Sequence, residues 1–157
     1  MRYLLRFYEH VSHERVLSGP GLQNIYAFLR DTGRATGSPV IAEQLHSADP
    51  AAVISAAALD GSCTLCARAL ELFVSVYGAA AGNLALKVMA TGGVYLGGGI
   101  APQILEKLQS PQLIEAFMAK RRLEPLCAAI PVRVILNPKT ALLGAARYAA
   151  LQASSLS

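Results

Sequence analysis

The most constraining feature of this sequence is an almost uncharged segment that runs from Leu72 to Leu105 and contains Lys87 as its single charge. A helix that crosses a membrane needs about 20 continuous apolar residues. Here isolated glycines, the glycine triplet 97–99 and Pro102 divide the segment into shorter pieces. We therefore predict that the segment forms buried elements of a folded core and that the chain does not span a membrane.

The composition describes one apolar domain. The 157 residues are 54% hydrophobic and 15% charged, so the chain can form one substantial core and is too apolar for disorder. This apolar share is high for a self-contained domain, which predicts that part of the surface contacts another domain or subunit. The net charge is +4, but the basic residues are scattered except for the run 120–122. The sequence therefore does not favour nucleic-acid binding.

Strand and helix patterns alternate along the chain, which predicts an α/β fold with a short mixed sheet packed by several helices. The longest helix is expected to begin at Ser62, with Asp60 or Ser62 as its cap. Its second half, residues 78–90, is small and apolar on nearly every side, so we expect protein around it. The other expected elements are an amphipathic helix from Leu22 to Gly33, strands at Val94–Leu96 and Val132–Leu136, and helices opening at Pro102, around Leu113–Met118 and from Thr140.

The strongest local motif is GGVYLGGGIAP at residues 92–102, in which a strand runs into three glycines and then a helix. Glycine lacks a Cβ, so the backbone can approach a ribose or phosphate closely while the helix N-terminus offers free amides. The alternative is a tight packing turn without a ligand. The motif does not extend to G-x-G-x-x-G and has no following G-K-S/T, so the Rossmann and P-loop interpretations both fail.

Cysteine and histidine give no metal site. Cys63 and Cys66 form a C-x-x-C pair, but zinc needs two further ligands and no second pair follows. We interpret them as small buried thiols at a helix start. His46 falls in a probable loop and is expected to be solvated. Three cysteines cannot all pair within one chain and no signal peptide is recognised, so we expect a reducing cytoplasm.

Five strings of this sequence resemble bacterial-type glucokinases, and they occur in the family's order. They are HVSHERVLSGPGL (10–22), SCTLCARALELF (62–73), AAGNLAL (80–86), GGVYLGGGIAP (92–102) and NPKTALLGAARYA (137–149). The resemblance implies membership of the actin-like ATPase and sugar-kinase superfamily, whose two α/β lobes close over sugar and ATP. It also implies that residues 1–157 are the C-terminal part of such an enzyme, a fragment of the large lobe without the N-terminal lobe.

The resemblance assigns roles to a few residues. Glu14 matches a glutamate that hydrogen-bonds glucose hydroxyls, a task that suits a carboxylate because it can accept from two hydroxyls at once. Gly97, Gly98 and Gly99 match the adenosine-side glycines. Together with Gly144 of the last helix, which is expected to pack against that turn, they are assigned to nucleotide binding. Asn83 matches the family's G-N pair, although a buried hydrogen bond to local backbone is the interpretation we favour.

The resemblance also shows what is missing. Phosphoryl transfer needs a base for the sugar hydroxyl, donors for the ATP phosphates and Mg²⁺, and the family's motifs for these are not found in residues 1–157. Asp31, Asp49 and Asp60 lie in caps and loops with no glycine-rich partner, so none is assigned as the base. We predict no catalytic residue and no metal ligand here, and an isolated chain that is inactive.

The implied parent enzyme uses ATP and Mg²⁺, phosphorylates glucose to glucose 6-phosphate, and is expected to form a homodimer, since related glucokinases commonly do. Two alternatives stay open. The chain could be a stand-alone interaction or regulatory module derived from a sugar-kinase lobe, with its apolar excess marking a partner surface. It could also belong to a kinase for another hexose.

Overall fold

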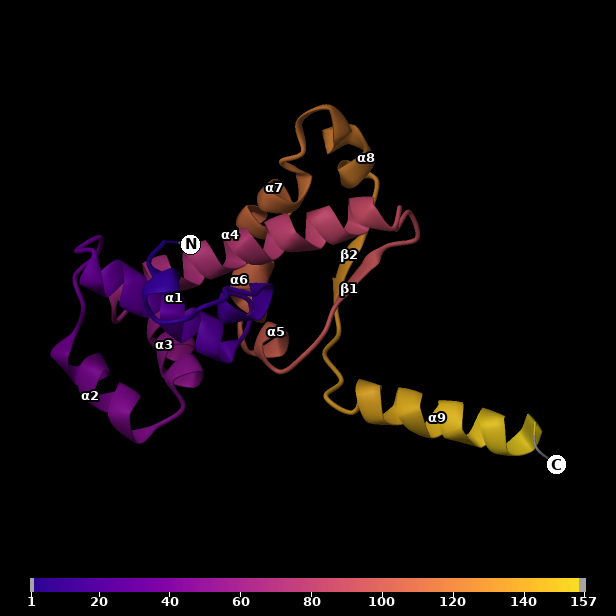
Figure 1. The fold of residues 1–157 in the computed structure, drawn as a ribbon, viewed down its shortest axis with the longest axis horizontal. Coiled ribbons are helices and arrows are strands. Elements are labelled where there is room, and N and C mark those ends of the chain that lie inside the picture. Colours follow the sequence, from indigo (N-terminus) through magenta and orange to yellow (C-terminus); the bar gives the residue numbers. More distant parts are fainter. Residues whose placement is uncertain (1, 156–157) are drawn as a thin grey trace.

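The computed structural model describes residues 2–155 and is mostly helical (Figure 1). Three short 3₁₀ turns and two strands accompany the α-helices. The helices are α1 (Gly19–Asp31), α2 (Pro39–Ser47), α3 (Pro50–Leu59), α4 (Thr64–Lys87), α5 (Ile100–Gln103), α6 (Leu105–Leu108), α7 (Pro111–Met118), α8 (Glu124–Ala128) and α9 (Thr140–Ser155). The strands are β1 (Val94–Leu96) and β2 (Val132–Val134), and the 3₁₀ turns are η1 (Leu4–Arg6), η2 (His13–Arg15) and η3 (Arg121–Leu123).

Helix α4 is the centre of the fold. It corresponds to the long buried helix that the sequence predicts. It packs against α7, α3 and α1, and the side chains of Leu65, Phe73 and Val74 are almost fully buried. By length and composition alone α4 could cross a membrane, yet its burial by three other helices makes it a core helix. The predicted cap is wrong: Cys63 is the capping residue, and its Sγ accepts the backbone N–H of Cys66 at 3.4 Å.

The second half of α4 crosses α7 at very short range because two glycines replace side chains there. A Cβ on Gly78 would collide with the backbone carbonyl of Leu113, and one on Gly82 would collide with the carbonyl of Phe117. Lys120, just after α7, donates from its Nζ to the carbonyl oxygen of Ala79 at 2.9 Å. The expectation of protein on nearly every side was too broad, since the opposite side of this half is open to solvent: Leu84 is 58% exposed.

The sheet consists of two parallel strands in the described part of the chain, with Val94 opposite Val132 and Leu96 opposite Val134. Parallel pairing requires a crossover connection, which α5 to α8 supply. Strand β1 matches the prediction, whereas β2 ends at Val134, two residues before the expected Leu136. Helix α5 begins at Ile100, directly after the glycine triplet, so Pro102 lies inside its first turn and does not open it.

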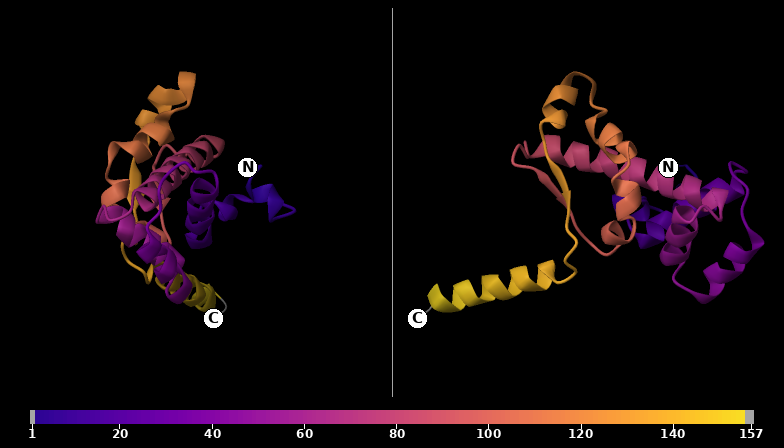
Figure 2. Two further views of the ribbon diagram at one scale, coloured as in Figure 1. Left: turned by 90° about the vertical axis from the view of Figure 1, so that its left-hand side faces the viewer. Right: turned by 180° about the vertical axis from the view of Figure 1, so that it is seen from behind.

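Helix α9 projects away from the other elements, as Figure 1 and the right-hand view of Figure 2 show. Residues 140–153 are all exposed, including the large apolar side chains of Leu142, Leu143, Tyr148 and Leu151. No heavy atom outside its own turn lies within 4 Å of the position that a Cβ on Gly144 would occupy. The helix therefore follows local propensity, and the exposed apolar side chains of Leu142, Leu143, Tyr148 and Leu151 lie outside the hydrophobic core of the described residues.

Candidate functional site

The glycine triplet that follows β1 is open to solvent. Gly97, Gly98 and Gly99 are all exposed, and Gly98 has a φ of +104°, a conformation that disfavours any side chain. Gly98 and Gly99 have nothing within 4 Å of the position a Cβ would take. A turn that served only for tight packing would not need this open space beside its backbone. The geometry therefore favours the other interpretation, in which a ligand approaches the backbone closely.

A pocket of about 430 Å³ lies over this triplet, and we call it the corner pocket. Four segments that are distant in the sequence meet around it, namely the start of α1, the start of α3, α4 at Tyr77, and the glycine turn with α5. Its lining residues are Leu17, Ser18, Gly19, Asp49, Ala51, Tyr77, Gly97, Gly98, Gly99, Ile100 and Gln103. This volume is within the usual range for small-ligand sites.

Glu14 lies in η2, the short turn that leads into α1. It is exposed, and its backbone carbonyl accepts a hydrogen bond from Ser18 Oγ at 2.6 Å. The same Oγ accepts the backbone N–H of Gly21 at 3.0 Å, which caps α1. Gly21 leaves no room for a Cβ against the backbone of Val16. The motif H-E-R-V-L-S-G-P-G is therefore a rigid entry to α1 that fixes the position of Glu14.

A second pocket of about 490 Å³ adjoins the first, and we call it the His13 pocket. Leu17, Tyr77 and Gly97 line both pockets, so the two adjoin along the Glu14 segment and the glycine turn, and we call the pair the recess. Glu14 itself is not a lining residue; its neighbours His13 and Leu17 are. Burial raises the pKa of the Tyr77 hydroxyl, so this side chain is a neutral wall between the pockets at physiological pH.

The structure brings one residue to the glycine turn that sequence reasoning set aside. Asp49 was expected to have no glycine-rich partner, and that expectation was wrong: Asp49 lines the corner pocket together with all three glycines. It caps α3, and its Oδ1 accepts the backbone N–H of Ala51 at 3.1 Å. The two segments are far apart in the sequence, so only the tertiary structure could show that both line one pocket.

Gly144 is not brought to this recess, because α9 stands apart from the glycine turn against which we expected it to pack. Asn83 also differs from expectation, since it is exposed and lines the His13 pocket, whereas a buried hydrogen bond to local backbone was favoured. Lys87, one turn further along α4, lines the same pocket. The His13 pocket thus carries a lysine, a cationic group that the lining of the corner pocket lacks.

Cys63 and Cys66 are buried thiols at the start of α4, as predicted. Burial raises the pKa of the Cys66 thiol strongly, with Cys63 as a second cause, so it stays protonated and is a poor nucleophile. Within residues 2–155, no group of three or more His, Cys, Asp or Glu side chains lies close enough together to hold a metal ion. No described residue is therefore assigned to Mg²⁺. His46 is exposed, as expected, but it lies in α2 and not in a loop.

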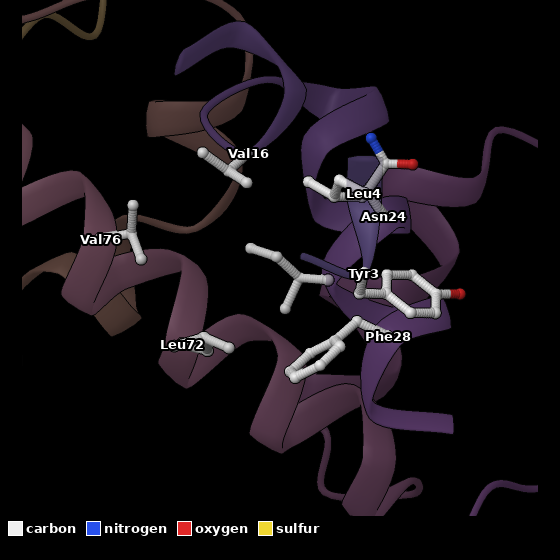
Figure 3. Close-up of a pocket in the computed structure, with 8 residues that line it drawn as sticks. Tyr3, Leu4, Val16, Asn24, Phe28, Leu72 and Val76 are labelled. Carbon is white, nitrogen blue, oxygen red and sulfur yellow. The ribbon is translucent and has the colours of Figure 1, made fainter. Parts of the chain in front are cut away.

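A smaller cavity of about 180 Å³ lies on the other side of α1, where the N-terminal turn packs over α1 and α4 (Figure 3). Tyr3 and Phe28 meet edge to face with ring centroids 5.4 Å apart, and Leu72 and Val76 close the floor. Asn24 is its only polar side chain apart from the Tyr3 hydroxyl. The Asn24 amide is already used, donating to the Arg15 carbonyl at 2.9 Å. This cavity is a packing gap in an apolar cluster.

Comparison with known proteins agrees with this geometry. The glucokinase family model matches residues 1–152. The glucokinase of Nostoc sp. (strain PCC 7120) is 45% identical over 163 residues, which cover 96% of this chain and 48% of that protein. The Synechocystis sp. (strain PCC 6803) glucokinase is 40% identical, with 96% and 46% covered. The glucokinase of Yersinia pestis (strain Pestoides F) is 42% identical over 139 residues, with 88% and 40% covered.

A solved glucokinase structure, from an Antarctic psychrotroph, superposes on this chain with a TM-score of 0.74 and 32% sequence identity. The match covers 91% of this chain and 42% of that one. This chain spans about half the length of the curated relatives it matches. Because the family model covers nearly the whole sequence, the conclusion about its ancestry is direct: the chain belongs to the bacterial glucokinase family.

Proposed function

We propose that this chain supplies the C-terminal half of an ATP-dependent glucokinase that converts glucose to glucose 6-phosphate in the cytoplasm. The observation that carries the proposal is the corner pocket, which is lined both by the start of α1 and by the exposed glycine triplet. The backbone of Glu14 is held next to the recess by the hydrogen bond from Ser18 Oγ, the residue that caps α1. In this role the Glu14 carboxylate accepts hydrogen bonds from glucose hydroxyls. The glycines, which have no side chains, let the nucleotide contact the backbone directly.

This half does not complete the reaction alone. The oxygen of a glucose hydroxyl must attack the terminal phosphorus of ATP while the bond from that phosphorus to ADP breaks, and the hydroxyl proton must pass to a base. The Glu14 carboxylate is assigned to glucose binding and the Asp49 carboxylate caps α3, so no described residue is assigned as this base, and none is assigned to Mg²⁺. We propose that a second half, equivalent to the part of the relatives that this chain does not match, supplies the base, the phosphate donors and the metal environment.

A complementation assay tests this proposal. The pure chain, assayed with glucose and Mg·ATP, is expected to give no glucose 6-phosphate above background. Adding the separately produced unmatched half of the Nostoc glucokinase is expected to restore turnover, and the Glu14→Gln chain to restore far less, mainly through a higher KM for glucose. Turnover by the chain alone, or full complementation by Glu14→Gln, would contradict the proposal.

A second candidate is an interaction module derived from the kinase lobe. It is favoured by the exposed apolar side chains of α9, among them Leu142, Leu143 and Leu151. The same assay separates the two, because a module that has lost kinase function cannot be complemented. If complementation succeeds, the rate with mannose and galactose in place of glucose identifies the preferred hexose, since the sugar hydroxyl pattern decides which one satisfies Glu14.

A further inference from the structure

The corner pocket and the His13 pocket differ in charge. Among the lining residues of the corner pocket, Asp49 is the only charged side chain, and there is no lysine, arginine or histidine. The adjoining pocket carries His13 and Lys87. A triphosphate would be repelled by an unneutralised carboxylate. The corner pocket therefore suits the uncharged nucleoside end of a nucleotide.

One of the two carboxylate oxygens of Asp49 is engaged in a hydrogen bond within the fold. Its Oδ1 accepts the Ala51 N–H at 3.1 Å and caps α3, while Oδ2 has no hydrogen-bond partner among residues 2–155. The cap fixes the rotamer of the side chain beside the glycine turn. An oriented carboxylate oxygen at the edge of a pocket lined by bare backbone is an acceptor for hydroxyl groups.

We infer that Asp49 accepts hydrogen bonds from the ribose hydroxyls of a nucleotide whose nucleoside lies in the corner pocket. This rests on the proposed kinase function, because it assumes that the glycine triplet faces a nucleotide. The other polar side chains of the pocket are less suited to the task. Ser18 Oγ already donates to the Glu14 carbonyl and accepts from the Gly21 N–H. A vicinal diol pairs well with one carboxylate, which accepts from both hydroxyls without offering a donor.

The test compares ATP with 2′,3′-dideoxy-ATP, which lacks both ribose hydroxyls, using the 157-residue chain and its Asp49→Ser variant. Serine is as good a helix cap as aspartate, so α3 is kept while the second acceptor oxygen is removed. Asp60→Ser is the matched control. Asp60 is another exposed aspartate whose Oδ1 accepts a backbone N–H, from Ser62 at 2.8 Å, but it does not line the corner pocket.

Ligand-observed NMR at millimolar nucleotide measures each affinity. The wild-type chain and Asp60→Ser are expected to bind ATP roughly tenfold more tightly than the dideoxy analogue, as expected for hydrogen bonds to a charged acceptor. Asp49→Ser is expected to bind both equally, with its affinity for the analogue unchanged from wild type. Circular dichroism checks that each variant is folded.

The outcomes separate the two proposals. If the wild-type chain binds both nucleotides equally, or if Asp49→Ser keeps the preference for ATP, the role of Asp49 is wrong while nucleotide binding at the glycine triplet stands. If the wild-type chain binds neither nucleotide, the nucleotide assignment itself fails, and the inference about Asp49 fails with it.

Discussion

Gly78 of α4 lies directly against the backbone carbonyl of Leu113 in α7, with no space for a side chain between them. Gly82 meets the carbonyl of Phe117 in the same way one turn later. Pairs of small residues four positions apart let two helix backbones approach each other closely. This pair lets α4 and α7 cross at close range, and α7 is part of the connection between β1 and β2.

Replacing Gly78 by alanine is therefore expected to destabilise the fold, although alanine is the better helix former. The added Cβ must push α4 and α7 apart, which costs on the order of 1–3 kcal/mol, as for other overpacked cores. Urea unfolding followed by circular dichroism gives the free energy of unfolding. Gly144→Ala is the matched control in a helix with free space around it, and it is expected to leave core stability unchanged. Equal effects at both positions would contradict the close crossing.

Lys120 provides a second link across the same crossing, because its Nζ donates to the Ala79 carbonyl at 2.9 Å. Lys120→Met keeps the length of the aliphatic stem and removes the donor. We expect a loss of about 0.5–1.5 kcal/mol in the free energy of unfolding, the usual net value of one hydrogen bond. Lys139→Met, at an exposed lysine ahead of α9, is the control. If Lys139→Met lowers the free energy of unfolding as much as Lys120→Met does, the effect comes from the loss of a positive charge and not from the hydrogen bond.

The buried Cys66 thiol makes stability depend on alkaline pH. Its pKa is raised by burial in the folded chain, while in the unfolded chain it ionises near pH about 8.5. Above that pH the unfolded state binds fewer protons than the native state, so stability falls as pH rises, by up to about 1.4 kcal/mol per pH unit. Urea unfolding at pH 8 and 9.5 measures this slope. Cys66→Ala is expected to flatten it, and an unchanged slope would show that another group is responsible.

Helix α9 is expected to contribute almost nothing to the stability of this chain, because residues 140–153 are exposed. Removal of residues 139–157 should change the free energy of core unfolding by less than about 0.5 kcal/mol, as for surface changes away from specific contacts. It should also reduce concentration-dependent association, since Leu142, Leu143 and Leu151 leave with the helix. Urea unfolding and light scattering check the two effects. A loss of core stability would mean that α9 folds back onto the core.

Local patterns predicted the elements whose causes are local. Strand β1 and helices α4, α7 and α9 follow from hydrophobic periodicity and glycine or proline punctuation, and the structure has them at or near the predicted positions. The helix cap at Cys63 was missed because a thiol is a weak acceptor, and Asp60 and Ser62 are better capping types. Their carboxylate and hydroxyl serve the preceding turn: Asp60 accepts the Ser62 N–H at 2.8 Å.

The candidate site was only half predictable. The glycine triplet and Glu14 lie in continuous motifs that the sequence displays, and the triplet is exposed as a ligand site requires. Asp49 has no local signal beyond a helix cap, and its place in the corner pocket depends on the tertiary structure. The opposite error concerns Gly144, whose small-residue stretch indicates close packing although nothing among the described residues lies within 4 Å of the position that its Cβ would take. A sequence pattern can indicate that a helix surface is suited to packing. Whether that surface is packed depends on the other segments that are present.

The two-stranded sheet has a consequence for how this polypeptide is handled during synthesis. Strands β1 and β2 pair only with each other in the described residues, so each has an outer row of amide and carbonyl groups that another chain could bind. Each row is only three residues long, which limits such pairing at low concentration. A partner that pairs with these edges is thus expected to raise the soluble yield, because fewer open edges remain for pairing between copies of this chain.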